Sequence, residues 1–297
     1  MTISTVGFIG LGVMGEPMCR NLARKCGKRV IAHDIDPAPL ERLAAVGVAD
    51  AGSVAGVAEG AELVFLSLPG GPELRAVAEG PGGLLGACAP GRTVVDTSTS
   101  PVSLSRETAT RFAEVGVDYA DAPIARTRAA AEAGTLSIMV GGSADVFARI
   151  RPFLDCCAAE VTHCGDVGAG QVVKLMNNMV LFQTVMALSE ALAIGRRAGV
   201  EGRVLFETLA KGSADSFALH NHGMKAILPG EFPERAFPVD YARKDLAYAL
   251  ELAAEMGVET AGAEAARGLL DAASEAGYGR NYFPALFNIV DEESGGS

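Results

Sequence analysis

Residues 5–19 read TVGFIGLGVMGEPMC, and this stretch decides the fold of the first half of the chain. A run of β-branched and aromatic residues leads into a GxGxxG sequence, and a helical pattern follows. In such a turn the first glycine permits a tight bend, the second admits a pyrophosphate close to the backbone, and the third lets helix and strand pack closely. The free amides at the helix start also favour phosphate. The sequence therefore predicts a dinucleotide-binding turn with these contact residues: Gly10, Leu11, Gly12, Val13, Met14 and Gly15.

An acidic residue, Asp34, ends the next apolar run, at about the twenty-residue spacing expected of a dinucleotide-binding βαβ unit. A carboxylate there accepts hydrogen bonds from the adenosine ribose and repels a 2′-phosphate. Asp36 adds a second negative charge, and no arginine directly follows Asp34. These features favour NAD over NADP as the cofactor. The alternative interpretation is a purely structural turn with a surface aspartate, because glycine-rich turns also arise for packing alone.

Short apolar runs alternate with helical stretches up to about residue 165, a pattern typical of parallel βαβ units. Gly170–Arg197 then contains no proline and few polar residues, which predicts one helix about 40 Å long and buried on most sides. We therefore expect an α/β, NAD-binding Rossmann domain with a mostly parallel sheet over residues 1–165. An all-α substrate and dimerisation domain over 166–297 follows, and the long interdomain helix joins the two.

Two serine or aspartate residues stand directly before proline and have the pattern of helix caps. They are Asp36, before Pro37, and Ser100, before Pro101. Both predict that a helix begins at the proline.

The composition is that of a globular protein, with 49% apolar and 21% charged residues and a formal charge of −11. Such an acidic chain repels polyphosphates, so we expect no nucleic-acid partner. No uninterrupted apolar run reaches the roughly 20 residues of a membrane span, and the N-terminus lacks the basic region of an export signal. We expect a cytoplasmic protein with no membrane partner and, because neither histidines nor cysteines show ligand spacing, no metal site. The long apolar helix would find cover in a second subunit, which favours a homodimer or homotetramer.

Further short motifs occur in order along most of the chain. They are Leu68-Pro69, Asp96-Thr97-Ser98-Thr99, Asp121-Ala122-Pro123, Gly134-Thr135-Leu136, Gly168-Ala169-Gly170 with Lys174 and Asn178, and Lys244-Asp245-Leu246. Together with the glycine turn, the series resembles the 3-hydroxyacid dehydrogenase family, which includes 3-hydroxyisobutyrate dehydrogenases and tartronate semialdehyde reductases. The resemblance runs from residue 7 to residue 246. It implies a Rossmann domain, a helical C-terminal domain and an active site in the cleft between them.

Lys174 is the candidate catalytic residue. Hydride transfer between a nicotinamide and a carbonyl leaves negative charge on the carbonyl oxygen, which therefore needs a proton donor beside it. A lysine among apolar neighbours serves as this general acid, or as the base in the oxidative direction, and the family's lysine falls on Lys174. Asn178 lies one helical turn later and would orient the amine or the substrate oxygen. The resemblance places Asn177 at the substrate; the plainer interpretation is a helix start with two asparagines facing solvent.

The resemblance assigns four more residues to the cofactor. Thr99 would lie near the nicotinamide ribose, Leu68 and Pro69 would form a wall, and Lys244 would reach the nicotinamide side of the cleft. Each also has a plainer interpretation: a helix cap for Thr99, core and turn for Leu68 and Pro69, and a surface lysine for Lys244.

One segment departs from the family pattern. Many relatives have Ser-Gly-Gly where this chain has Ala125-Arg126-Thr127. An arginine presents a planar fork suited to an oxyanion, and the segment is similar to that of the sulfolactaldehyde reductase branch, where Gly-Arg-Thr holds a sulfonate. Arg126 with Thr127 would bind a carboxylate or a sulfonate; the alternative is a surface arginine near Glu132.

These observations predict an NAD(P)-dependent oxidoreductase that interconverts a small anionic 3-hydroxy acid, or a related alcohol, and its semialdehyde. Two other functions stay open. One is sulfolactaldehyde reduction to 2,3-dihydroxypropane-1-sulfonate, and the other is a non-catalytic module that binds NAD.

Overall fold

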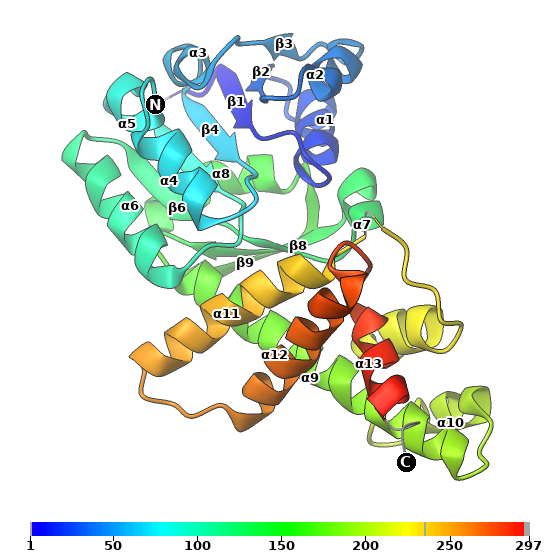
Figure 1. The fold of residues 1–297 in the computed structure, drawn as a ribbon. Coiled ribbons are helices and arrows are strands. Elements are labelled where there is room, and N and C mark those ends of the chain that lie inside the picture. The colour runs from blue at the N-terminus through cyan, green and yellow to red at the C-terminus, as the bar shows by residue number, and fades with distance from the viewer. Residues whose placement is uncertain (1, 235, 294–297) are drawn as a thin grey trace. The chain divides into compact units, whose positions relative to one another are not determined.

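The computed structural model describes residues 2–234 and 236–293. The chain forms two compact units, Met1–Lys174 and Leu175–Ser297, which are described separately below. Helix α9 (Ala169–Arg197) begins in the first unit and continues into the second (Figure 1).

The first unit is built on one sheet, in which the strands follow the order β3-β2-β1-β4-β5-β6-β8-β7, with β9 paired to β8. The strands are β1 (Thr5–Ile9), β2 (Arg29–His33), β3 (Ala49–Asp50), β4 (Leu63–Leu66), β5 (Thr93–Asp96), β6 (Asp118–Asp121), β7 (Ile124–Ala125), β8 (Leu136–Gly141) and β9 (Ala158–Gly165). All pairs from β3 to β6 are parallel, whereas β8 runs antiparallel to β6 and β7. The strand order reverses around β1, which creates a switch point where ligands bind in open α/β sheets. The predicted Rossmann fold with a mostly parallel sheet is confirmed.

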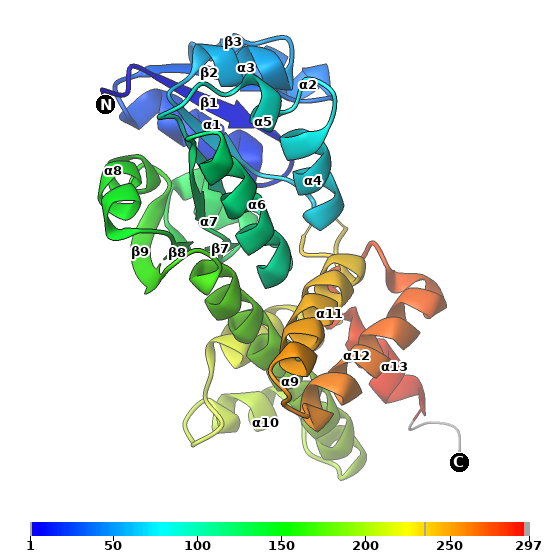
Figure 2. The same cartoon turned by 90° about the vertical axis from the view of Figure 1, so that its left-hand side faces the viewer.

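Helices cover both faces of this sheet, which explains why the strands are continuous apolar runs (Figure 2). One hydrophobic core joins the sheet to α1, α2, α7 and α8, and a second core joins it to α3, α4, α5 and α6. The helices are α1 (Gly15–Lys25), α2 (Pro37–Ala44), α3 (Val54–Gly60), α4 (Gly71–Glu79), α5 (Leu84–Ala87), α6 (Val102–Glu114), α7 (Arg128–Ala133) and α8 (Ala144–Leu154).

Of the two predicted helix caps, one is confirmed and one is wrong. The Asp36 carboxylate accepts a hydrogen bond from the Ala38 amide at the start of α2. Ser100 does not cap α6, which begins after Pro101 without a side-chain cap. The Ser100 hydroxyl instead lies 3.1 Å from that of Ser105.

The second unit is helical, as predicted. After α9 come α10 (Gly202–Leu209), a π-helical segment (Leu219–Ile227), α11 (Val239–Glu255), α12 (Ala261–Ala273), a further π-helical segment (Ser274–Tyr278), a 3₁₀ turn (Phe283–Ala285) and α13 (Leu286–Glu293). Aromatic residues occupy its interior: the ring of Phe182, on α9, lies 5.2 Å from that of Phe283 and 6.0 Å from that of Phe237. Aromatic pairs at these separations add stability beyond the area that they bury.

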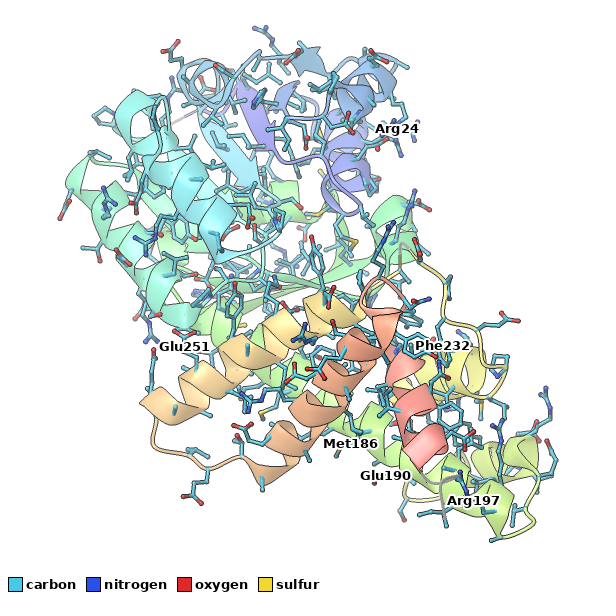
Figure 3. The ribbon with its side chains drawn as sticks, viewed as in Figure 1. Arg24, Met186, Glu190, Arg197, Phe232 and Glu251 are labelled. Atoms are coloured by element: carbon cyan, nitrogen blue, oxygen red, sulfur yellow. The ribbon has the colours of Figure 1, made fainter. Side chains whose placement is uncertain are left out.

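Helix α9 is continuous, as predicted, but it is not buried on most sides. Val180 is 59% exposed and Ile194 is 68% exposed. Met186, Glu190 and Arg197 follow one another along the same helix (Figure 3). By length and composition α9 is long and apolar enough to cross a membrane, which corrects the expectation that no segment qualifies, although 44% of its most apolar stretch is buried within the protein. Core helices of soluble proteins share these properties, so the helix is weak evidence for a membrane.

Candidate functional site

The glycine turn lies at the carboxyl end of β1. Each of its three positions favours glycine for a different physical reason. Gly10 has a φ of +90°, and a Cβ there would lie 2.3 Å from the Ser67 carbonyl oxygen. A Cβ on Gly15 would lie 2.0 Å from the Gly10 carbonyl oxygen. A Cβ on Gly12 would meet no heavy atom within 4 Å. The chain's own packing thus requires the outer two glycines, whereas Gly12 leaves open space beside the backbone, and this space fits the close approach of a pyrophosphate.

The Asp34 carboxylate lies directly beside this turn. It accepts one hydrogen bond from the Leu11 amide and another, 2.8 Å long, from the Asp36 amide. The acid that ends β2 therefore ties the end of that strand to the glycine turn. Because a carboxylate has about four acceptor positions, two remain for ribose hydroxyls.

The carboxyl ends of β4 and β5 bring Leu68 and Thr99 to the same edge of the sheet, because both strands are parallel to β1. Leu68 lies beside the turn: its Cδ2 is 3.2 Å from where a Cβ on Gly10 would stand. Its amide donates to the Ser98 hydroxyl at 2.8 Å. Leu68 and Thr99 are half-buried, and Pro69 is exposed.

Lys174 lies near the start of α9 and is only 9% exposed. Two residues without a predicted role, Asp121 and Gln171, hold this end of the helix. The Asp121 carboxylate accepts hydrogen bonds from the amides of Gly168 (2.6 Å) and Gln171 (2.8 Å). Burial raises the pKa of Asp121 to about 6, although these two hydrogen bonds oppose the shift. In the sequence, Asp121 stands out only as part of the Asp121-Ala122-Pro123 motif, and Gln171 only as a polar residue at the start of the apolar stretch Gly170–Arg197.

Arg126, at the end of β7, has a φ of +86° and is the only non-glycine residue with positive φ among residues 2–234 and 236–293. Its guanidinium donates to the Thr135 carbonyl oxygen at 2.7 Å. Arg126 and Thr127 are exposed, and Ala125 is half-buried. Glu132 pairs with Arg128, at 2.9 Å. A glycine would adopt this positive φ without strain, whereas the Cβ of Arg126 makes it unfavourable.

In the second unit, Asn178 and Lys244 meet at a carboxylate that sequence reasoning did not single out. Asn178 Nδ2 donates to Asp245 Oδ2 at 2.8 Å, and Lys244 Nζ lies 3.2 Å from Asp245 Oδ1. Asp245 is 3% exposed, so the carboxylate orients the Asn178 amide inside a buried network. Lys244 also lies over two aromatic rings, those of Tyr241 at 5.3 Å and Tyr248 at 5.4 Å, which are cation–π distances.

Asn177, next to this network, is exposed and donates to the Asn178 side-chain oxygen at 3.1 Å. In the sequence, only the position of Asp245 beside Lys244 in the Lys-Asp-Leu motif could have indicated that it belongs to the site. In the part of the chain that the structure describes, no three His, Cys, Asp or Glu side chains gather as a metal site requires.

Two family models match consecutive parts of the chain. A model of the NAD binding domain of 6-phosphogluconate dehydrogenase matches residues 5–165. A model described as NAD-binding of NADP-dependent 3-hydroxyisobutyrate dehydrogenase matches residues 168–290. Together they span nearly the whole chain.

Individual relatives cover both units as well. The chain is 36% identical to 2-(hydroxymethyl)glutarate dehydrogenase of Eubacterium barkeri, over 98% of this chain and 96% of that one. It is 36% identical to 3-hydroxyisobutyrate dehydrogenase of Pseudomonas aeruginosa, over 92% and 93%. A solved structure of Mycobacterium tuberculosis 3-hydroxyisobutyrate dehydrogenase with L-serine superimposes with a TM-score of 0.89 at 29% identity, covering 97% of this chain and 99% of that one.

Proposed function

Because this chain belongs to the 3-hydroxyisobutyrate dehydrogenase family of NAD(P)-binding oxidoreductases, we propose that it interconverts a small anionic 3-hydroxy acid and its semialdehyde. The observation that carries the proposal is the burial of Lys174 at the start of α9, in the same unit as the open backbone at Gly12. The buried amine of Lys174 suits proton transfer, and the open backbone at Gly12 suits the binding of a dinucleotide.

In this mechanism a bound nicotinamide dinucleotide supplies or accepts the hydride. Lys174 donates a proton to the carbonyl oxygen during reduction and removes it from the hydroxyl during oxidation. A desolvated amine interacts more strongly with a developing oxyanion than an amine in water does. Asn178, held by Asp245, is the residue that would orient the reacting oxygen or the amine.

Residues of the first unit would hold the cofactor. The backbone from Gly10 to Gly15 would receive the pyrophosphate, and Leu68 and Thr99 would line the nicotinamide end of the sheet edge. Asp34 supports NAD rather than NADP as the preferred cofactor. A 2′-phosphate at the ribose would meet the Asp34 carboxylate, which is already fixed against the turn by the Leu11 amide.

The substrate is an anion in this proposal. The names of two relatives describe carboxylic acids with a hydroxymethyl group, 2-(hydroxymethyl)glutarate and 3-hydroxyisobutyrate. The Arg126 guanidinium, held in place by the Thr135 carbonyl oxygen, supports an anionic substrate and offers a planar pair of donors. A sulfonate fits these donors as well as a carboxylate does, which makes sulfolactaldehyde the second candidate substrate.

A substrate panel read by nicotinamide absorbance tests the proposal. The panel contains 3-hydroxyisobutyrate, 2-(hydroxymethyl)glutarate, tartronate semialdehyde, succinic semialdehyde and sulfolactaldehyde, each with NAD(H) and NADP(H). We expect turnover of at least one member, and Lys174→Ala should lose more than about 100-fold in kcat while NADH affinity, measured by fluorescence, changes less than about threefold. Lys211→Ala, at an exposed lysine, is the matched control and should behave as wild type.

Two results would contradict the proposed mechanism or the proposed function. A Lys174→Ala enzyme that keeps a tenth of the wild-type rate would exclude Lys174 as the proton donor. A protein that binds NADH but turns over no member of the panel would be the non-catalytic module instead.

A further inference from the structure

The side chain of Gln171 is fully buried and joins two segments of the first unit. Its Nε2 donates to the Ser98 carbonyl oxygen at 2.8 Å, and its Oε1 accepts from the Ser100 amide at 3.3 Å. A carbonyl can only accept and an amide N–H can only donate, so these two partners fix the orientation of the Gln171 amide. The Gln171 side chain therefore forms hydrogen bonds with the backbone on both sides of Thr99.

This segment, residues 98–100, lies at the edge of the sheet where the proposed cofactor would bind. Thr99 comes three residues after β5 ends, at the carboxyl edge where parallel sheets bind ligands. Ser98 also accepts the Leu68 amide through its hydroxyl and donates its own amide to Asp96. A continuous chain of hydrogen bonds therefore runs from the loop after β4, through the loop after β5, to Gln171.

The same residue is fixed to the start of α9 through its backbone. The Gln171 amide donates to Asp121 Oδ2. A Cβ on Gly170 would lie 2.4 Å from the Met139 carbonyl oxygen, so this turn of the helix lies directly on β8 with no room for a side chain. Lys174 follows Gln171 by three residues, which places both side chains on one face of the helix.

We propose that Gln171 is a positioning residue that sets the distance between the amine of Lys174 and the cofactor-binding loop at Thr99. The inference rests on the proposed function, because it assumes that Lys174 transfers the proton. Every contact that supports it lies within the first unit. An error of about 1 Å in the placement of a reacting group can cost about 100-fold in rate, so a rigid link between donor and cofactor loop has a large effect on kcat and a small one on cofactor binding.

Two substitutions and one control test the proposal. Gln171→Leu removes both side-chain hydrogen bonds and keeps the volume nearly constant. Gln171→Glu keeps the shape, but its carboxylate cannot donate to the Ser98 carbonyl oxygen, whereas its protonated form can. Gln183→Leu makes the same change on the same helix at a half-buried site, where the amide donates only within its own helix, to the Met179 carbonyl oxygen.

We expect Gln171→Leu to lower kcat by about 100-fold, with NADH affinity within threefold of wild type and a larger deuterium isotope effect from dideuterated NADH. Gln171→Glu should show a similar loss at pH 8 and recover at least tenfold, relative to wild type, at pH 5.5. In the cofactor-free protein, hydrogen–deuterium exchange over residues 97–101 should increase in Gln171→Leu, because the Ser100 amide loses its acceptor. Gln183→Leu should match wild type in kcat, NADH affinity, the isotope effect and hydrogen–deuterium exchange.

The outcomes separate this inference from the function on which it rests. If Lys174→Ala is inactive but Gln171→Leu keeps kcat within threefold, the positioning role is wrong and the proposed function stands. A loss of kcat in Gln171→Leu that Gln171→Glu does not recover at low pH, or unchanged exchange over residues 97–101, also overturns the positioning role. If Lys174→Ala is as active as wild type, Lys174 is not the proton donor and the positioning role fails with it. If wild type turns over no substrate of the panel, the proposed function itself fails.

Discussion

Arg126 has a left-handed backbone, and comparing two substitutions at this position would separate strain from function. A left-handed conformation costs a residue with a Cβ about 1–2 kcal/mol, and glycine escapes that cost but loses about 0.5–1 kcal/mol through its greater freedom in the unfolded chain. Arg126→Ala and Arg126→Gly both lose the hydrogen bond to the Thr135 carbonyl oxygen, so this loss cancels in the difference. We therefore expect Arg126→Gly to be more stable than Arg126→Ala by about 1 kcal/mol.

Urea unfolding followed by circular dichroism measures this difference, provided that the two variants share one m-value. In a thermal scan it corresponds to about 2–4 °C in Tm. For activity, each variant removes a charged donor from the anionic substrate, which is worth about 1.5–3 kcal/mol, or about 10- to 100-fold in kcat/KM. Both variants should lose this factor equally, and Arg126→Lys should recover part of it because it restores the charge without the planar fork.

Equal stability of the glycine and alanine variants would refute the strain argument. Full activity in Arg126→Gly, together with a loss in Arg126→Ala, would refute the role of the guanidinium and assign the effect to loop shape. The expected combination, in which the more stable variant is as inactive as the less stable one, would mean that the strained arginine is kept for binding.

Two further predictions concern the first unit. Asp34→Ser should raise kcat/KM with NADPH relative to NADH by about tenfold or more, because a charge pair 4 Å apart is worth about 1–4 kcal/mol between water and a protein surface. Steady-state kinetics with both cofactors measures the ratio, and Asp145→Ser, at an exposed aspartate on α8, is the control. An unchanged ratio in Asp34→Ser would contradict the role of Asp34. Glu62→Gln should destabilise the protein by about 1–2 kcal/mol at pH 7, since Glu62 accepts the amides of Ser4 and Thr5. Burial alone would raise the pKa of Glu62, but these hydrogen bonds, with Arg92, outweigh it and lower that pKa to about 2. Because this folded-state pKa lies below the unfolded one, ionised Glu62 stabilises the protein above about pH 4.5, and this contribution is lost as the pH falls through 2. The difference in urea midpoint between wild type and Glu62→Gln should therefore narrow from pH 7 to pH 3.5. A difference that stays constant over this range would refute the role of Glu62.

The glycine turn was predictable from the sequence because its causes are local. Gly10 and Gly15 are required by atoms of the same strand-turn-helix unit or the adjacent strand, and the cap at Asp36 forms within three residues. The Ser100 cap prediction was wrong because the Ser100 amide and hydroxyl have other partners, Gln171 and Ser105. A partner 71 residues away in the chain is invisible to local pattern reasoning.

The same limit explains what sequence reasoning missed at the candidate site. Asn178 was identified, but the carboxylate that orients it belongs to Asp245, 67 residues later. The antiparallel pairing of β8 with β6 and β7 was also not predicted, because β7 has only two residues and gives no periodic signal. The exposure of Val180 and Ile194 was missed because composition indicates how apolar a helix is, not which of its sides the fold covers.

The buried carboxylate of Asp121 lowers the stability of the fold at neutral pH, but it defines the start of α9. Its folded-state pKa, about 6, lies above the ordinary value of 3.8, mainly because of burial. The sign of this shift means that the group stabilises the fold when protonated, below pH 3.8, and that this contribution is lost as the pH rises through 6. At neutral pH the ionised carboxylate thus costs about 3 kcal/mol. An asparagine would avoid that cost, but it would turn an NH₂ group toward one of the two amides, those of Gly168 and Gln171, that the carboxylate accepts. In the carboxylate, each oxygen accepts one of the two amides. Asp121 therefore lowers the stability of the fold at neutral pH, while its two hydrogen bonds fix where the helix that carries Gln171 and Lys174 begins.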